Sequence, residues 1–205
     1  MRITILLFIF ISSVYNSEDK LTLKLLSKVV TNQNIIVGID DLDNLYFINN
    51  DELIKSTNQK NYYYKNSLYS SITSIEVENS LKIKLFYEDS NTLIILDNKL
   101  SEISKINFNV IDPDKIISKV SASNDNNIWI YNELNSKLEL FNYVNKKIKV
   151  VNSEVSGEVI SLVSNYKYCW VLTDSHIFKF NYFGSLISKL KVTKIQQIEN
   201  FNNTL

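Results

Sequence analysis

One pattern returns along this chain at intervals of about 40 residues, and it limits the possible folds more than any other feature. A polar, turn-prone patch is followed by consecutive apolar residues, a second polar turn and an alternating run. One residue directly before or at the start of each apolar run serves as a marker, and a fifth marker lies where the pattern begins again: Asn44, Asn91, Asn127, Tyr168 and Asn203. Successive markers are 47, 36, 41 and 35 residues apart. That interval is the length of a four-stranded propeller blade.

The segment 116–150 is the best-formed copy of the pattern. Successive side chains of a strand point to opposite faces, so Ile128 and Ile130 face one way while Trp129 and Tyr131 face the other. Both faces are apolar, which predicts a strand covered on both sides, as in a blade packed between two neighbours. The next run, 137–140, alternates apolar and polar residues and is expected nearer the rim.

The predicted fold is therefore all-β, a β-propeller of four-stranded antiparallel blades. We expect about four complete blades and a partial fifth that begins near Glu199 and stops at Leu205. Either the segment 21–30 completes the last blade and closes the ring, or the ring is incomplete. A half-made blade leaves open strand edges, and we expect a propeller domain over 18–205 that is truncated at its C-terminus.

Asparagine is the main candidate for turn chemistry. The chain has 27 Asn but only three Gly and one Pro, Pro113, and Asn tolerates positive φ. An AT-rich coding sequence would produce the same bias. Asp112-Pro113-Asp114 is expected to be a turn between units.

Residues 1–17 resemble a secretory signal peptide. Arg2 precedes the apolar run Ile3–Ile11, and a polar stretch begins at Asn16. The run is too short to span about 30 Å of hydrocarbon as a helix. We expect cleavage between Ser13 and Ser17, export to the periplasm or medium, and no transmembrane span after the signal is removed; a buried N-terminal strand is the alternative.

The net charge, the single cysteine and the single histidine argue against several kinds of functional site. A formal net charge of zero argues against a nucleic-acid partner. Cys169 is the only cysteine and lies in an apolar run, so it is expected in the core, and the only histidine, His176, is expected at a strand end. Asp40, Asp41 and Asp43 lack the spacing and glycine of a calcium loop and are expected in a turn. We predict no catalytic, cofactor-binding or metal-ligating residue, and no cofactor.

Aromatic clusters are expected to serve packing. Alternation places Tyr63 opposite Tyr62 and Tyr64, so one side of this run packs, while a stacking surface for sugar or peptide is the alternative. Trp129 and Trp170 occupy equivalent places in consecutive units and are expected to pack between blades.

The third unit resembles the propeller repeats of exported bacterial proteins, including those of two-component-regulator sensor regions. The matching residues are the strand 120–122, Asp125, the run Asn126-Asn127-Ile128-Trp129-Ile130 and the return strand 138–142. Asn126 stands where the family has a turn glycine, and it is expected to supply positive φ. The resemblance implies a fold and no assigned activity.

These features predict a non-enzymatic exported propeller that binds a protein or glycan of the cell envelope, through the polar turns around its strands. One alternative is a propeller-scaffold enzyme, a glycosidase or lyase, which would need carboxylates that converge at the central mouth. Another is the sensor fragment of a larger receptor.

Overall fold

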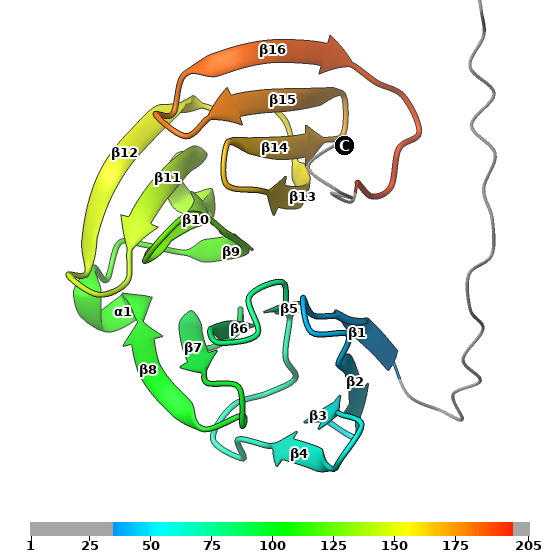
Figure 1. Cartoon of the computed structure of the whole chain (residues 1–205). Helices are drawn as coiled ribbons and strands as arrows, with labels where there is room; N and C mark the ends of the chain where they lie inside the picture. Colours follow the sequence, from blue (N-terminus) through cyan, green and yellow to red (C-terminus); the bar gives the residue numbers. More distant parts are fainter. Residues whose placement is uncertain (1–34, 199–205) are drawn as a thin grey trace, which may run out of the picture. The chain divides into compact units, whose positions relative to one another are not determined.

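The computed structural model describes residues 35–198, with the side chains of 152–154 excepted, and these residues belong to one compact unit. The expected signal peptide, the segment 21–30 and the marker Asn203 lie outside the described residues. The described part is built of four four-stranded antiparallel sheets (Figure 1), and in each sheet the strands are neighbours in the order in which they follow along the chain.

The four sheets are named blades 1 to 4. Blade 1 consists of β1 (Ile35–Ile39), β2 (Leu45–Asn49), β3 (Glu52–Ser56) and β4 (Asn61–Tyr64), and blade 2 of β5 (Ser74–Glu76), β6 (Ile83–Tyr87), β7 (Thr92–Leu96) and β8 (Glu102–Asn107). Blade 3 consists of β9 (Ile117–Ala122), β10 (Asn127–Asn132), β11 (Lys137–Asn142) and β12 (Lys147–Glu154), and blade 4 of β13 (Val159–Ser164), β14 (Tyr168–Thr173), β15 (His176–Asn181) and β16 (Leu186–Lys191).

The two described helices are short and lie in connections. The α-helix α1 (Phe108–Ile111) follows β8, and the 3-10 helix η1 (Glu133–Asn135) joins β10 to β11. Asp112-Pro113-Asp114 follows α1 as the predicted turn between blades 2 and 3.

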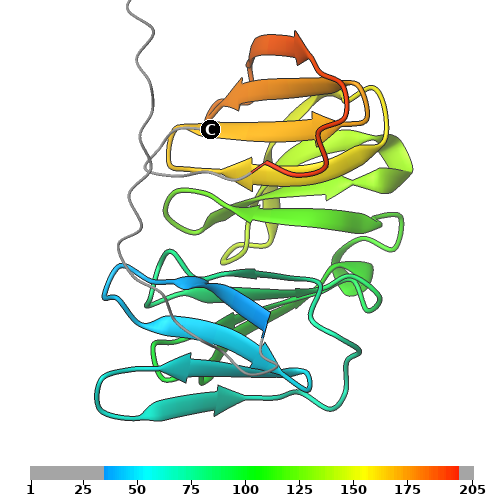
Figure 2. The same cartoon turned by 90° about the vertical axis from the view of Figure 1, so that its right-hand side faces the viewer.

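The blades stand side by side with their first strands innermost and their fourth strands at the rim (Figures 1 and 2). The inner strands β5, β9 and β13 contact one another in turn. This is the predicted β-propeller architecture. Within residues 35–198, no hydrophobic core joins blade 4 to blade 1, so the ring is not closed there.

Alternate residues of the central strands fill three separate cores between consecutive blades. Ile128 and Ile130 pack toward blade 2, while Trp129 and Tyr131 pack toward blade 4. A third core joins blades 1 and 2 and contains Tyr46. The prediction that a strand with apolar residues on both faces is covered on both sides is confirmed.

The run 137–140 lies in β11, nearer the rim than β10 as expected, although Leu138 and Leu140 are buried and β12 lies outside it. Two details differ from the sequence expectation. Positive φ in the turn before β10 belongs to Asp125 (φ 53°), not to Asn126. The run 195–198 forms no strand, and Ile198 instead packs on the outer face of blade 4.

The register of the second unit is also different. Asn44, Asn127 and Tyr168 each lie at the start of a second strand, whereas Asn91 precedes β7, the third strand of its blade. The second strand of blade 2 is β6, and the turn that leads into it is 77–82. Both β6 and β7 are fully buried, so either run fits the apolar pattern.

Candidate functional site

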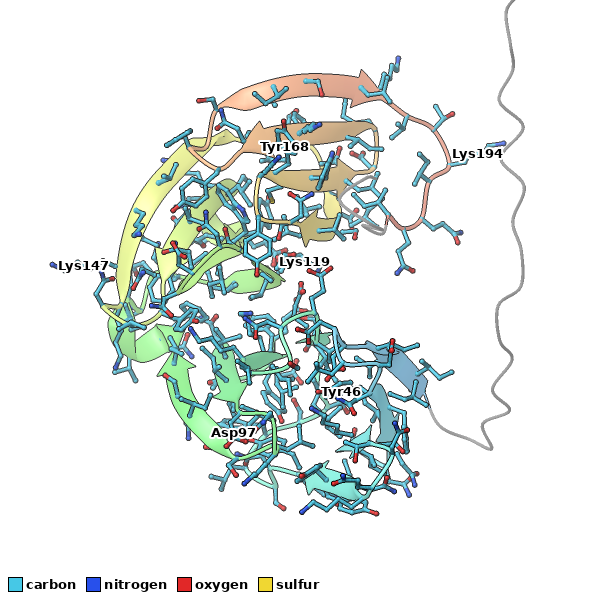
Figure 3. All side chains as sticks on the ribbon, viewed as in Figure 1. Tyr46, Asp97, Lys119, Lys147, Tyr168 and Lys194 are labelled. Carbon is cyan, nitrogen blue, oxygen red and sulfur yellow. The ribbon has the colours of Figure 1, made fainter. Side chains whose placement is uncertain are left out.

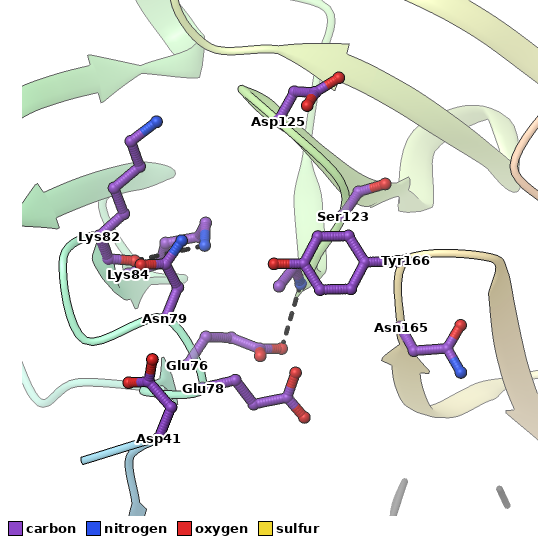
Figure 4. Close-up of a pocket in the computed structure, with 11 residues that line it drawn as sticks. Asp41, Glu76, Glu78, Asn79, Lys82, Lys84, Ser123, Asp125, Asn165 and Tyr166 are labelled. Atoms are coloured by element: carbon purple, nitrogen blue, oxygen red, sulfur yellow. Dashed lines mark hydrogen bonds between the residues drawn. The ribbon is translucent and has the colours of Figure 1, made fainter. Parts of the chain in front are cut away.

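The turns that join the first and second strands of the four blades meet around one cavity of about 570 Å³. Figure 4 shows its polar lining in close-up. Blade 1 contributes one residue and blade 2 contributes five. The lining residues are Asp41, Glu76, Glu78, Asn79, Lys82, Lys84, Ala122, Ser123, Asp125, Asn165 and Tyr166.

Local turn chemistry orients the lining in blades 1 and 4. The Asp40 carboxylate accepts hydrogen bonds from the backbone N–H groups of Leu42 and Asn44, both at 2.9 Å. Asn165 Oδ1 accepts from the N–H groups two and three residues later, at 2.9 and 2.8 Å. Such bonds fix the turn, and in each case the next residue, Asp41 or Tyr166, lines the cavity.

Glu76 lies at the end of β5 and links blade 2 to blade 3. Its Oε1 accepts hydrogen bonds from Ser121 Oγ at 3.0 Å and from the Ala122 N–H at 3.2 Å. Ser121 Oγ also lies 2.8 Å from Ser164 Oγ on β13. Burial raises the pKa of Glu76, because removal from water disfavours the charged carboxylate.

The lysines of blade 2 are held within the same wall. Burial lowers the pKa of Lys84, which is almost fully enclosed. Its Nζ donates to the Lys82 carbonyl oxygen at 3.3 Å. Lys82 Nζ donates to Asn126 Oδ1 at 2.8 Å, which joins the turn of blade 2 to that of blade 3.

Three further carboxylates line the cavity and lack such hydrogen bonds. Asp41, Glu78 and Asp125 form no side-chain hydrogen bond and no salt bridge with any described residue. Burial raises the pKa of Glu78, and the nearby Lys84 opposes that rise. The site is therefore a polar mouth whose acidic groups are available to a ligand.

A second cavity of about 420 Å³ lies at the opposite ends of the inner strands. Its walls are formed by the starts of β5, β9 and β13 and by Gln196 and Gln197. Lys119 on β9, labelled in Figure 3, is one of the lining residues, and its Nζ donates to the Ser118 carbonyl oxygen at 3.1 Å.

Residues considered for sites in the sequence lie away from the main cavity, except Asp41. Cys169 is buried in the core between blades 3 and 4, and His176 begins β15, as predicted. In the part of the chain that the structure describes, no group of three or more His, Cys, Asp or Glu side chains could hold a metal ion.

The aromatic predictions hold for Tyr63, Tyr64 and Trp129 but not for Trp170. Tyr63 is exposed on the outer strand β4, and Tyr64 on the opposite face is buried. Trp129 and Trp170 occupy the third position of their strands and both are buried. Trp129 packs between blades 3 and 4, whereas Trp170 packs against Val192 and Ile198 rather than against another described blade.

Sequence reasoning missed the contribution of blade 2. Glu76, Glu78, Asn79, Lys82 and Lys84 surround the turn 77–82, but Asn91 was aligned with the second-strand markers of the other units. A signal was present, because a polar turn also precedes the apolar run 83–87. Acidic residues do converge at the central mouth, as the enzyme alternative requires.

Comparison with solved structures supports the fold. The chain is similar to the WD40 repeats of RRP9, with 9% identity and a TM-score of 0.59 over 80% of this chain and 52% of that one. It is also similar to virginiamycin B lyase from Staphylococcus aureus, with 10% identity and a TM-score of 0.54 over 78% of this chain and 55% of that one. A third similar structure is a protein of unknown function from Bacteroides caccae, with 9% identity and a TM-score of 0.53 over 84% of this chain and 66% of that one. The chain thus spans about half to two thirds of the length of these structures.

No family model matches the sequence, and no curated protein matches it. At 9–10% identity, the likeness to solved structures establishes the propeller fold alone. Among the described residues, no helix has the length and apolar character needed to cross a membrane.

Proposed function

We propose that the chain is a non-enzymatic, exported propeller module that binds a protein or glycan of the cell envelope at the mouth formed by its first turns. The observation that carries this proposal is the convergence of four turns on one cavity of about 570 Å³ with polar walls. Ligand sites are concave and contain a few convergent polar groups.

Tyr166 gives this site an amphipathic contact surface. Its side chain is 64% exposed at the edge of the cavity, where the ring offers an apolar face to a sugar or peptide. The Asn165 amide oxygen accepts from two backbone N–H groups, and its NH₂ group donates to none of the described residues. Together they supply stacking and hydrogen bonding.

The test is binding of the purified protein to a glycan array and to peptides from envelope proteins, with Tyr166→Ala and Tyr63→Ala compared. Tyr63 is also exposed but lies on β4, away from the cavity. We expect Tyr166→Ala to lose at least about tenfold in affinity, which corresponds to about 1.4 kcal/mol, and Tyr63→Ala to keep its affinity. Retained binding in Tyr166→Ala would place the ligand elsewhere.

Export is the second part of this proposal. It rests on Arg2 followed by the apolar run Ile3–Ile11. A fusion of residues 1–20 to alkaline phosphatase, which is active only after export, is expected to be active. Replacement of Leu6 and Phe8 by Asp is expected to abolish that activity, and an inactive parent fusion would remove export from the proposal.

An acid–base enzyme, a glycosidase or lyase, is the second candidate function. It is favoured by one observation: Glu76 and Glu78 line the same cavity, and burial raises the pKa of both carboxyls. A carboxyl with a raised pKa can remain protonated and act as a general acid. Turnover of aryl glycosides or uronic-acid polymers that is lost in Glu76→Gln would favour this candidate over a binding module.

A further inference from the structure

One face of blade 1 is apolar across all four of its strands. Phe47 follows Tyr46 on β2, and because Tyr46 packs toward blade 2, the Phe47 side chain lies on the opposite face. In the register of the sheet, Phe47 lies opposite Ile36 on β1 and Ile54 on β3. Ile54 in turn lies opposite Tyr63 on β4. These four side chains form one continuous row across the sheet, and we call the row Ile36, Phe47, Ile54 and Tyr63 the head face.

The head face corresponds to a seam between blades, but no described blade covers it. Ile130 and Val171 lie three residues after their markers, as Phe47 does, and both are fully buried against the preceding blade. No member of the head face belongs to a hydrophobic core of the described residues. Ile36 and Tyr63, at the two ends of the row, are 51% and 56% exposed. A continuous apolar surface of this kind marks an interaction site.

The other end of the array of blades has a different surface. Residues of the segment 192–198, which curls back after β16 in Figure 1, pack against Trp170 on the outer face of blade 4. Leu190 on β16 lies on the same face and is 62% exposed, and Ile195 in the segment is 37% exposed. Lys194 is also exposed there and is labelled in Figure 3. We call Leu190, Lys194 and Ile195 the tail face.

The two ends of the array carry opposite charges. Asp40 and Lys55 pair with each other, and besides them the segment 35–64 contains four acidic residues and one lysine. The segment 175–198 contains four lysines and no acidic residue. The net charge of the chain is zero, so the two signs are separated toward the two ends of the molecule.

This separation favours one mode of contact between two copies of the chain. Glu52 lies two residues before Ile54 on β3 and therefore on the same side of the sheet, so two head faces in contact would bring like charges together. Two tail faces would do the same through Lys194. A head face against a tail face pairs unlike charges, whereas contacts between like charges cost several kcal/mol.

We propose that the head face of one copy packs against the tail face of a second copy, so that the chain assembles head to tail. The second copy then covers the face of blade 1 that a preceding blade would cover. Because the two surfaces differ, each copy can use both of them, and the assembly grows until a ring closes. This inference concerns a surface separate from the cavity and does not depend on the ligand proposed there.

The experiment measures the molar mass of the full chain, which is 23.8 kDa for one copy, by sedimentation equilibrium over a range of concentrations. The mass is expected to rise with concentration to at least about twice that of one copy. The head variant is Ile36→Lys with Tyr63→Lys, and the tail variant is Lys194→Glu with Ile195→Glu. Each places the charge of the opposing face on exposed positions, so each variant alone is expected to remain a monomer.

A mixture of the two variants distinguishes this arrangement from the others. The head variant keeps an intact tail face and the tail variant keeps an intact head face, so the equimolar mixture is expected to form a one-to-one complex. The matched control is Ile103→Lys with Val110→Lys, which changes exposed apolar residues of β8 and α1, outside both faces. It is expected to associate like the wild type, and thermal unfolding verifies that all variants are folded.

Every other outcome overturns the inference. A wild-type chain that stays monomeric means that no second copy covers the head face. A tail variant that still associates alone indicates contact between two head faces, and a head variant that does so indicates contact between two tail faces. Association of every variant alone indicates contact through the apolar run Ile3–Ile11, which all of them contain. A mixture that stays monomeric, or a control that loses association, also contradicts the head-to-tail contact.

Discussion

At the scale of single residues, Asp40 shows how a turn becomes part of a core. Its carboxylate accepts hydrogen bonds from Tyr46 Oη at 2.9 Å and from the Asn44 side chain, and it pairs with Lys55 Nζ at 3.2 Å. The side chains of Asp40 and Lys55 are almost fully buried. The sequence predicted the turn and the antiparallel strands of the blade, but it did not predict the ion pair between Asp40 and Lys55 on β3.

Asp40→Asn is expected to destabilise the protein by about 3 kcal/mol, because it leaves the Lys55 ammonium buried without a carboxylate. Urea unfolding monitored by tryptophan fluorescence measures the change. Asp43→Asn is the matched control: Asp43 is exposed with φ 60°, which Asn tolerates, so its effect should stay within about 0.5 kcal/mol. Equal stability of the two variants would show that the buried pair contributes little.

The same carboxyl predicts a pH dependence. Burial alone would raise the pKa of Asp40, but hydrogen bonds from Asn44, Tyr46 and Leu42 outweigh burial and lower it from 3.8 to about 2. The folded state therefore binds the proton less tightly than the unfolded state, so this contribution to stability is present above pH 3.8 and is lost as the pH falls toward 2.

The measurement is the difference in unfolding free energy between the wild type and Asp40→Asn from pH 6 to pH 2. Other carboxyls cancel in this difference. It is expected to be constant at the upper end and to shrink as the pH falls below about 4. A difference that grows at low pH would contradict the lowered pKa.

At the scale of strands, the seam between blades 3 and 4 follows directly from alternation. Trp129 lies opposite Leu140 on β11 and Ser121 on β9, and its indole enters a core with Leu162, Cys169 and Val171 from blade 4. Two-sided burial was predictable because β10 has apolar residues at consecutive positions. The identity of the partners was not, because they come from another blade.

Trp129→Ala is expected to cost about 3–5 kcal/mol, since it removes a large side chain from the seam and leaves a cavity. Guanidinium unfolding followed by circular dichroism gives the change in free energy. Val144→Ala is the control, because Val144 is 65% exposed in the turn after β11 and should change stability by about 0.5 kcal/mol or less. A loss below about 1 kcal/mol in Trp129→Ala would argue against packing between the blades.

The strands also explain why half of the candidate site escaped sequence analysis. The first strand of blade 2, β5, has three residues, Ser74-Ile75-Glu76, and gives no apolar run. The stronger runs mark β6 and β7, so the pattern placed the unit one strand too late. Turns in blades 1, 3 and 4 were located correctly, but their convergence around one cavity depends on the arrangement of the blades.

At the scale of the whole molecule, each blade is stabilised through its neighbours. Blades 2 and 3 are packed by other blades on both faces. Blade 4 is covered on one face by blade 3 and on the other by residues of the segment 192–198. In blade 1, Ile35 and Ile39 on β1 are largely exposed. In arrays of repeats, the stability of a unit depends on such contacts with its nearest neighbours.

This arrangement predicts a gradient of protection in native-state hydrogen exchange. Amides of β6, β7 and β10, which lie in the two central blades, are expected to exchange at least about tenfold more slowly than those of the rim strands β4 and β16, because opening them exposes two cores. Peptide-level mass spectrometry at pH 7 resolves these segments. Weakening the seam with Trp129→Ala should speed exchange in β10 and β14 more than in β2, since only the former line that core. Uniform exchange in all four blades, with or without the substitution, would mean that the described residues open as one cooperative unit instead.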